Sequence, residues 1–594
     1  MKAWTRGILC LLVALCAGAA GIAQPGAAPE SAGHTPWWKN AVIYEIYPRS
    51  FQDSNRNGIG DLNGITSRLD YLQNLGVNAI WLTPIYPSPQ VDFGYDISDY
   101  TAIDPQYGTM ADFDRLTAEA RKRNIGVIMD LVLNHTSDKH PWFIESASSR
   151  TNPKADWYVW HDPKIVNGKR EPPNNWQSVF GHSAWQWDPA RKQYYYHRFY
   201  IQQPDLNWNN PQVRKAMYDM VRFWIRHGVA GFRLDAITSL FEDPSFSNEA
   251  YVLGPDGKPV INAYGDKEVM TNKTDNLPEV HDVLRELRRV ADEAGNRNVV
   301  LIGETYLESI ADLRKMYGPR NDELQLPMDM QVGFINKLDV PLFRRRINEA
   351  ETEIGDNQPL FVFDNHDNPR WDRYQLSASG TPVFGYGPHH AGIGRVLATI
   401  LFASRDTAMF YYGDEIGMVT TPPTRKEDVK DPIGITGWPK EKGRDGERTP
   451  MQWNDGPDAG FSAGHVKTWL PIPPSYTTYN VAAEQDQPNS MLHWYEQLMA
   501  LRKQDPALHS GDEIMLNTSD NKVLSWLRKA PDGEAVVVAC NFTDQPRTVN
   551  LDVSAQGVQG THASTLMITP GTPEPASLSK VQLGPYGVYV GKVQ

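Results

Sequence analysis

Short apolar runs that alternate with helical patterns are the feature of this sequence that most restricts its fold. Each run is four to eight residues long, the usual length of a buried β-strand. Between most of them lie apolar residues at helical spacing, such as Val280, Val283, Leu284 and Leu287. Strand then helix, repeated eight times, predicts an α/β protein with a (β/α)8 TIM barrel. The eight runs cover residues 41–47, 78–82, 126–133, 229–234, 299–302, 324–330, 360–363 and 407–412.

Three carboxylates lie where these runs end. Asp235 directly follows the fourth run, Glu304 comes just after the fifth, and Asp367 comes just after the seventh. The carboxyl ends of barrel strands form the face where loops converge over a rigid floor. We therefore expect the three acids to meet in one pocket, and a pair of acids in one pocket can cleave a glycosidic bond.

The alternation is interrupted once and then gives way to another pattern. Residues 135–205 are rich in Trp, Pro, Asn and Gly and too long for a plain loop, which predicts a subdomain inserted after the third strand. Residues 511–594 show alternating strands, typical of a C-terminal antiparallel β-domain of the β-sandwich kind. Residues 37–134 and 206–510 are left for the catalytic barrel.

The N-terminal residues have the pattern of a secretory signal. Lys2 and Arg6 precede an apolar stretch, and small residues follow it up to Ala23. This predicts a signal peptide over residues 1–23 and a disordered lead-in over 24–36, with export to the periplasm or the medium. No other segment is long and apolar enough to cross a bilayer, so we expect no membrane contact after cleavage. Only Cys540 then remains, which leaves no intrachain disulfide.

Composition narrows the class of partner. The formal net charge of -13 argues against nucleic acid, whose phosphates call for a basic surface. The chain is also rich in aromatic residues, with 18 Trp, 26 Tyr and 19 Phe. Flat aromatic faces suit sugar rings, so a neutral oligosaccharide or disaccharide is the expected partner. Composition leaves the oligomeric state open.

Several motifs resemble those of a known family. Four segments, in order, resemble the signature segments of the α-amylase superfamily, glycoside hydrolase family 13. Two more, Gln203-Pro-Asp-Leu-Asn-Trp208 and Arg448-Thr-Pro-Met-Gln-Trp453, are similar to those of its oligo-1,6-glucosidase and α-glucosidase branch. The resemblance covers nearly all of the chain after Trp37. The four segments are Asp130-Leu-Val-Leu-Asn-His135, Gly231-Phe-Arg-Leu-Asp235, Gly303-Glu-Thr305 and Asn365-His-Asp367.

The resemblance implies a retaining mechanism. Asp235 is then the nucleophile that forms a covalent glucosyl-enzyme, and Glu304 is the acid that protonates the leaving oxygen and later activates water. Asp367 grips the sugar hydroxyls beside the reacting carbon. Arg233 lies two residues before the nucleophile, so strand alternation points it the same way, where its charge can hold Asp235 ionised.

The resemblance also assigns residues that bind the sugar. Asp92 and Arg448 correspond to an acid and an arginine that close the end of the cleft in exo-acting glucosidases, although Arg444 is a nearby rival for the second role. A closed end predicts release of one glucose at a time. The further substrate-binding candidates are Tyr95, His135, Arg233 and His366, together with Phe180 and Phe199 at the entrance.

A loop after the first strand has the spacing of a cation site. Asp53, Asn55, Asn57 and Asp61 place oxygen atoms at alternate positions, with the Ile59 carbonyl as a further ligand. The loop resembles the calcium loop of this branch, which implies a structural Ca2+, although the family often has Asp where Asn57 stands. An empty asparagine-rich turn is the alternative. No organic cofactor is expected.

Two sequence positions narrow the choice of substrate and reaction. Ala236 follows the nucleophile where α-1,6 enzymes of the branch typically have valine, which favours maltose and short maltooligosaccharides over isomaltose. Trehalose synthase-like isomerases also have alanine there, but their fourth segment differs from Asp364-Asn-His-Asp-Asn368. The resemblance thus predicts an exo-acting α-glucosidase with transglycosylation as a side activity. An isomerase, an oligo-1,6-glucosidase and, more remotely, a non-catalytic subunit like those of amino-acid transporters remain as alternatives.

Overall fold

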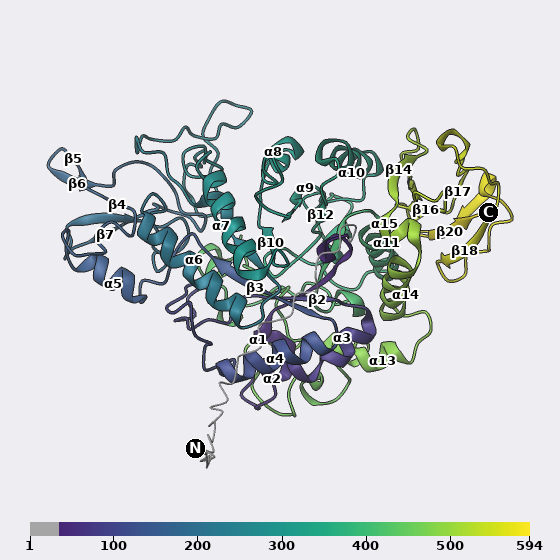
Figure 1. Cartoon of the computed structure of the whole chain (residues 1–594), viewed down its shortest axis with the longest axis horizontal. Helices are drawn as coiled ribbons and strands as arrows, with labels where there is room; N and C mark the ends of the chain where they lie inside the picture. The colour runs from purple at the N-terminus through teal and green to yellow at the C-terminus, as the bar shows by residue number, and fades with distance from the viewer. Residues whose placement is uncertain (1–34) are drawn as a thin grey trace, which may run out of the picture. The chain divides into compact units, whose positions relative to one another are not determined.

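The computed structural model describes residues 35–594 (Figure 1). The predicted signal peptide and the lead-in up to residue 34 lie outside the described residues. From Thr35 onward, none of the helices combines the length and the apolar content needed to cross a membrane. Cys540 is buried in this part of the chain as a free thiol.

Eight parallel strands form the central sheet, in the order β11-β10-β9-β3-β2-β1-β13-β12. A parallel bridge between Asp329, just after β11, and Phe361 of β12 joins the two ends, so the sheet closes into the predicted barrel. The strands are β1 (Val42–Ile46), β2 (Ala79–Leu82), β3 (Gly126–Val132), β9 (Gly231–Asp235), β10 (Val300–Gly303), β11 (Leu326–Pro327), β12 (Leu360–Phe361) and β13 (Thr407–Tyr411).

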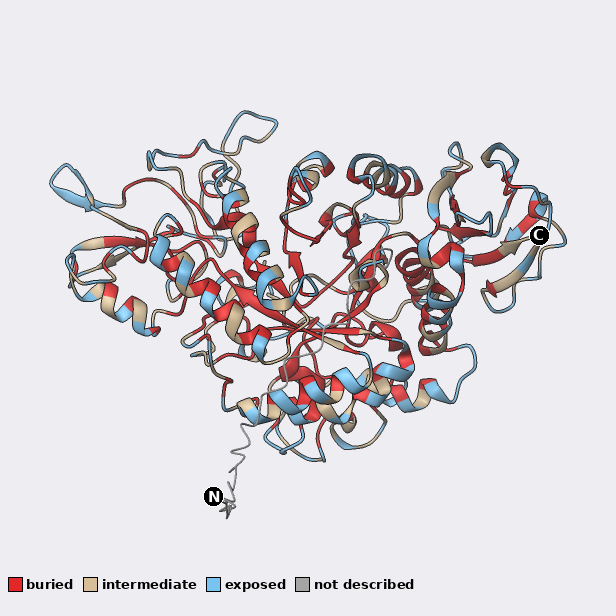
Figure 2. Cartoon of the chain, viewed as in Figure 1, coloured by how far each residue is buried: buried red, intermediate tan, exposed pale blue. Residues whose placement is uncertain are grey.

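The strands are buried because helices cover the outside of the barrel (Figure 2). In α7, Val280, Val283, Leu284 and Leu287 are all less than 1% exposed, as their helical spacing predicts. The main helices are α2 (Leu62–Ser67), α3 (Leu69–Leu75), α4 (Met110–Lys122), α6 (Pro211–Arg226), α7 (Val280–Gly295), α8 (Ile310–Lys315), α10 (Val340–Ile354), α11 (His390–Ala403) and α14 (Met491–Gln504). Shorter helices are α1 (Pro48–Phe51), α9 (Met330–Gly333), α12 (Pro432–Gly437), α13 (Val481–Gln485) and α15 (Pro506–Ser510).

The segment after β3 forms the inserted antiparallel subdomain. Its central sheet has the order β4-β8-β7, and a separate hairpin pairs β5 with β6. Trp176, Trp185 and Tyr196 form a small aromatic core of its own. The elements are α5 (Pro141–Ser148), β4 (Trp160–His161), β5 (Lys164–Val166), β6 (Lys169–Glu171), β7 (Trp185–Asp188) and β8 (Gln193–Tyr196).

A second long excursion, between β9 and α7, was not predicted. Residues 240–279 contain no strand longer than an isolated bridge; Tyr251 pairs with Val269 and Ile261 pairs with Lys267. The excursion packs against the inserted subdomain, where the Trp176 indole N–H donates to the Ser247 carbonyl at 3.0 Å. The two insertions therefore support each other beside the catalytic face.

The C-terminal part is an antiparallel β-domain. A five-stranded sheet has the order β14-β15-β16-β20-β18, and β17 pairs with β19 in a second, two-stranded sheet. Val537 and Tyr589 from the larger sheet share a core with Val549 and Val581 from the smaller one. The strands are β14 (Asp512–Leu516), β15 (Val523–Lys529), β16 (Ala535–Asn541), β17 (Arg547–Val549), β18 (Ala563–Ile568), β19 (Val581–Leu583) and β20 (Val588–Val593).

Candidate active site

A cavity of about 370 Å³ opens at the carboxyl ends of the barrel strands. Asp235 is the last residue of β9, and Glu304 is the first residue after β10, so both strands deliver an acid to the same face. Parallel neighbours end at one edge, which explains why these acids meet. Of the residues predicted from sequence, those that line the cavity are Asp92, Tyr95, His135, Phe180, Phe199, Asp235, Glu304 and Asp367.

Arg233 holds the two central acids together. One terminal nitrogen of its guanidinium lies 2.8 Å from an Asp235 oxygen, and the other lies 2.6 Å from a Glu304 oxygen. The same side chain donates to both oxygens of Asp130 at 3.0 Å. Arg233 is 0% exposed and does not line the cavity. The contacts of Arg233 are therefore to the acids, and its predicted part in substrate binding stays a prediction.

The backbone after the nucleophile fixes the second acid. The Ala236 N–H donates to a Glu304 carboxylate oxygen at 2.8 Å. Ala236 has φ 43°, in the left-handed region that alanine rarely adopts. Strained backbone at a cavity wall is typical of a functional site, and here the strain aims an N–H at Glu304.

Burial and charge act in opposite directions on the two acids. Burial raises the pKa of Asp235 and of Glu304, and the Arg233 charge opposes the rise in both cases. The negative charge of Glu304 further raises the pKa of Asp235. One shared guanidinium cannot neutralise two carboxylates, so the pair favours a state with one proton between them.

Asp367 is held as a carboxylate by three neighbours. Arg444 and Arg448 each donate to the same oxygen at 2.8 Å, and the His366 ring lies 3.2 Å from the other. Although burial acts to raise the pKa of Asp367, these groups lower it below the usual range. Its side chain remains 23% exposed, so it can still accept sugar hydroxyls from the cavity.

His366 lies behind the cavity wall instead of facing a sugar. Its ring stacks on Tyr95 at 5.5 Å, and its Nδ1 lies 2.6 Å from a Glu45 oxygen. The other ring nitrogen is 2.7 Å from the Tyr95 hydroxyl. His366 is 0% exposed and is not among the residues that line the cavity, so its predicted sugar contact stays a prediction. It positions Tyr95 and Asp367, which do line the cavity.

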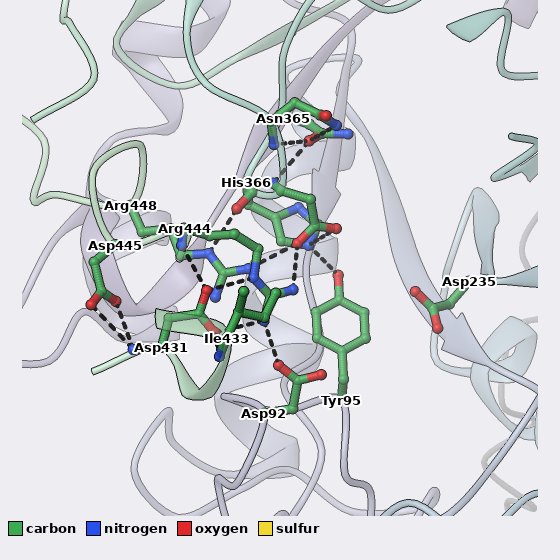
Figure 3. A network of polar contacts seen from close by, with 12 residues as sticks. Asp92, Tyr95, Asp235, Asn365, His366, Asp431, Ile433, Arg444, Asp445 and Arg448 are labelled. Carbon is green, nitrogen blue, oxygen red and sulfur yellow. Dashed lines mark hydrogen bonds and ion pairs between the residues drawn. The ribbon is translucent and has the colours of Figure 1, made fainter. Parts of the chain in front are cut away.

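Arg444 lines the cavity and joins two of its acids. Its guanidinium donates to Asp92 at 2.8 Å (Figure 3). It also donates to Asp367 at 2.8 Å and lies 5.6 Å from the Phe180 ring. Arg448 is 1% exposed, does not line the cavity and makes no contact with Asp92. Of the two arginines, Arg444 is thus the one that pairs with Asp92 and lines the cavity.

The side wall comes from the inserted subdomain. The Phe199 ring lies 5.1 Å from the His135 ring and 5.7 Å from Phe180. Gln203 is 0% exposed, lies 3.1 Å from the His135 ring nitrogen and donates to Asp92 at 3.3 Å. Gln203 was missed as a site residue although it begins one of the quoted motifs.

The mouth of the cavity combines residues that sequence reasoning also missed. Arg198 of the inserted subdomain faces Asp275 of the second excursion at 3.6 Å, and its guanidinium donates to the Thr274 hydroxyl at 3.0 Å. Tyr306 is 40% exposed and stacks on Phe334. The remaining residues that line the cavity are Val179, Ala236, Thr238, Ser239 and Ile433.

The predicted cation loop lies outside this cavity. Asp53 accepts the backbone N–H groups of Asn55, Arg56 and Gly58. Asp61 accepts the backbone N–H and the hydroxyl of Ser54 and the backbone N–H of Gly64. Each carboxylate has about four lone-pair positions, so each keeps about one for a cation. Among residues 35–594 there is no group of three or more His, Cys, Asp or Glu that suits a metal. The loop therefore offers a cation two carboxylates, and its other ligands would be amide and carbonyl oxygens.

A (β/α)8 barrel that brings two acids, held by one guanidinium, to a shared cavity has the equipment of a glycoside hydrolase. The family profile for the alpha amylase catalytic domain matches residues 45–511, and that for the maltogenic amylase C-terminal domain matches residues 514–590. The chain belongs to the α-amylase family, glycoside hydrolase family 13, in its α-glucosidase and oligo-1,6-glucosidase branch.

Individual relatives agree with this branch. A probable alpha-glucosidase of Rhizobium meliloti is 41% identical over 87% of this chain and 91% of its own length. An oligo-1,6-glucosidase of Parageobacillus thermoglucosidasius is 38% identical over 86% of this chain and 91% of its own. The crystal structure of the alpha-glucosyl transfer enzyme XgtA matches with a TM-score of 0.83 and 37% identity, covering 94% of this chain and all of that one. The protein is therefore an enzyme that acts on α-glucosides by hydrolysis or transglucosylation.

Proposed function

We propose that the protein is an exo-acting, retaining α-glucosidase that releases glucose from the non-reducing end of maltose and short maltooligosaccharides. The observation that carries this is Arg444, which spans Asp92 and Asp367 at one end of the cavity. We take this ion-pair network to close the cavity one sugar ring beyond the acids. The glucose at that end of a chain is the unit removed, and transglycosylation is a side activity.

The chemistry follows from the two acids. Asp235 attacks the anomeric carbon while Glu304 gives its proton to the glycosidic oxygen, which leaves with the rest of the sugar. Glu304 then takes a proton from water, and the hydroxide attacks the anomeric carbon and frees Asp235. A retaining pair lies about 5 to 5.5 Å apart, against about 6.5 to 9.5 Å for an inverting pair. Binding to adjacent nitrogens of Arg233 supports the shorter separation.

The charge of the cavity supports a neutral substrate. Five carboxylates line it, and both lining arginines, Arg198 and Arg444, are paired with carboxylates. A phosphorylated sugar would meet excess negative charge there. This separates the proposal from the trehalose-6-phosphate hydrolase of Bacillus subtilis, a relative that is 36% identical.

An α-glucoside isomerase is the second candidate. The isomaltulose synthase of Erwinia rhapontici, solved with its natural substrate sucrose, matches with a TM-score of 0.82 and 33% identity over 95% of this chain. Both reactions share the glucosyl-enzyme and differ in whether water or the released sugar attacks it.

Ala236 leaves space beside the scissile bond, which supports an α-1,4 preference over the α-1,6 preference of the oligo-1,6-glucosidases, by about 1 to 3 kcal/mol.

Time-resolved product analysis tests the proposal. With maltoheptaose, glucose should be the first product to accumulate, because the closed end admits one ring at a time. With maltose, isomaltose, sucrose and trehalose, free glucose should exceed isomerised disaccharide, and maltose should give the highest kcat/KM. Early maltotriose or longer fragments would show endo action, and isomerised product in excess would favour the second candidate.

We also propose that the loop at 53–61 binds a structural Ca2+. Asp53, Asn55, Asn57 and Asp61 would supply side-chain oxygens and Ile59 its carbonyl, with the chain turning at Gly58, which has φ 85°. The loop carries none of the acids that line the cavity, so the ion would act on stability alone.

A chelator should therefore lower the melting temperature while kcat on intact enzyme stays unchanged. Calorimetry with EDTA, and again after Ca2+ is restored, measures the shift. Mg2+ restored in place of Ca2+ serves as the control for selectivity. A melting temperature that EDTA does not move would mean that the loop is an empty turn.

We further propose that the enzyme is exported to the periplasm or the medium. The support is the charged, apolar and small-residue pattern of residues 1–23. A neutral sugar outside the inner membrane is a substrate that an exported hydrolase can reach.

A further inference from the structure

Three carboxylates share the guanidinium of Arg444, and one of them differs from the others. Asp92 and Asp367 line the cavity, where they face the space that a sugar would fill. Asp431 does not line it and is 0% exposed. Asp431 can therefore hold Arg444 whether or not a sugar is present.

The contacts to Asp431 are the most extensive that Arg444 makes. One Asp431 oxygen accepts from Nε of Arg444 at 2.8 Å and from its backbone N–H at 2.6 Å, and the other accepts from a terminal nitrogen at 3.0 Å (Figure 3). Burial acts to raise the pKa of Asp431, but the Arg444 charge lowers it to about 2. The ion pair with Arg444 therefore favours the ionised carboxylate.

A second aspartate completes a reciprocal clamp. Asp445, next to Arg444, accepts the backbone N–H groups of Lys430 at 2.6 Å and Asp431 at 3.1 Å. Asp431 therefore accepts a backbone N–H from the segment of Arg444, and Asp445 accepts backbone N–H groups from the segment of Asp431. Asp431 also accepts the N–H of Ile433 at 3.3 Å at the start of α12, and Ile433 lines the cavity. One buried carboxylate fixes both Arg444 and this part of the wall.

Sugar binding adds donors to two of the acids that hold Arg444. Arg444 donates to one oxygen each of Asp92 and Asp367, so sugar hydroxyls that bind these carboxylates share the acceptors with it. A guanidinium held by these two acids alone would be free to shift when a sugar binds. Asp431 lies outside the cavity, so it can keep the Arg444 guanidinium in position while Asp92 and Asp367 bind the sugar.

We propose that Asp431 is a positioning residue that holds Arg444 across the closed end of the glucose-binding cavity and so sets the affinity for the terminal glucose. The inference rests on the proposed function, because it assigns a role in binding the sugar that the enzyme releases. Asp431 acts through Arg444 and touches no substrate.

The test is a double-mutant cycle on p-nitrophenyl α-glucoside. Asp431→Asn removes the charge and one acceptor but keeps the size of the side chain. It should raise KM about tenfold, the effect of losing one charge-assisted hydrogen bond, while kcat changes by less than about threefold. In an Arg444→Ala background the same substitution should change KM by less than about twofold, because the residue through which it acts is gone.

Asp428→Asn is the matched control. Asp428 lies in the same segment and pairs with Arg425 at the surface, so its loss should leave KM unchanged. Asp431→Glu keeps the charge but displaces it, so its KM should lie between those of the wild type and Asp431→Asn. This variant tests the inference if Asp431→Asn does not fold. The inference would be overturned if Asp431→Asn raised KM as much in the Arg444→Ala background as in the wild type, or if folded Asp431→Asn had an unchanged KM. Neither result would affect the proposed function. A wild-type enzyme that releases no glucose would overturn the proposed function instead.

Discussion

Replacing Asp235 with asparagine should lower kcat on p-nitrophenyl α-glucoside by about 10⁴-fold or more, the scale seen when a nucleophile is removed from an enzyme. The amide cannot form the glucosyl ester, so neither half of the reaction proceeds. Arg233 keeps two of its three carboxylate partners, Asp130 and Glu304, so the barrel should remain folded. Initial rates, with the melting temperature measured on the same sample, give the result.

Asp275→Asn is the control for this experiment. Asp275 also lines the cavity, but it pairs with Arg198 at the mouth and lies on neither β9 nor β10. Its loss should change kcat by far less than the loss of Asp235. Mass spectrometry of the wild-type enzyme with a slow fluorinated glucoside should find the sugar attached to Asp235. Retained turnover in folded Asp235→Asn, or label on another residue, would contradict the assignment.

The barrel and the position of its acids could be predicted from sequence because local patterns encode them. A buried parallel strand is a short apolar run, and an acid that follows such a run is carried to the catalytic face by the strand itself. Asp235 and Glu304 needed no tertiary information beyond that. β11 and β12 were predicted longer than they are, because apolar residues flanking a strand look the same in sequence as residues within it.

The choice between Arg444 and Arg448 could not be made in the same way. Both lie in one loop four residues apart, and both donate to Asp367. What separates them is Asp431, a residue 13 positions earlier that holds Arg444 toward Asp92. Such a contact depends on how two loop segments pair, and loop pairing has no periodic signal.

His366 shows a different limit of sequence motifs. Its place beside Asp367 in a family motif indicated a sugar contact, yet the structure buries it between Tyr95 and Glu45. A motif records which residues are needed and not which of them touch the substrate. The excursion at 240–279 was missed for a related reason, because polar and turn residues without period predict only a connection.

Replacing Arg233 with leucine should lower the free energy of unfolding by about 3 to 5 kcal/mol near neutral pH, because Asp130, Asp235 and Glu304 would stay buried without their cation. The loss should also depend on pH. Arg233 lowers the pKa of Asp235 and Glu304, so without it both folded-state values rise further. A carboxyl whose pKa is raised by folding contributes stability that is present below its unfolded pKa and is lost as the pH rises through its folded pKa.

The difference in stability between wild type and Arg233→Leu should therefore grow from pH 5 to pH 8, by up to about 1.4 kcal/mol per pH unit for each additional bound proton. Urea unfolding at several pH values measures it. Arg373→Leu is the matched control: Arg373 is also buried, but it donates to the carbonyls of Gly333, Phe363 and Pro369 and to no carboxylate. Its loss should cost stability equally at every pH. If the two variants show the same pH dependence, Arg233 does not set the protonation of the catalytic acids.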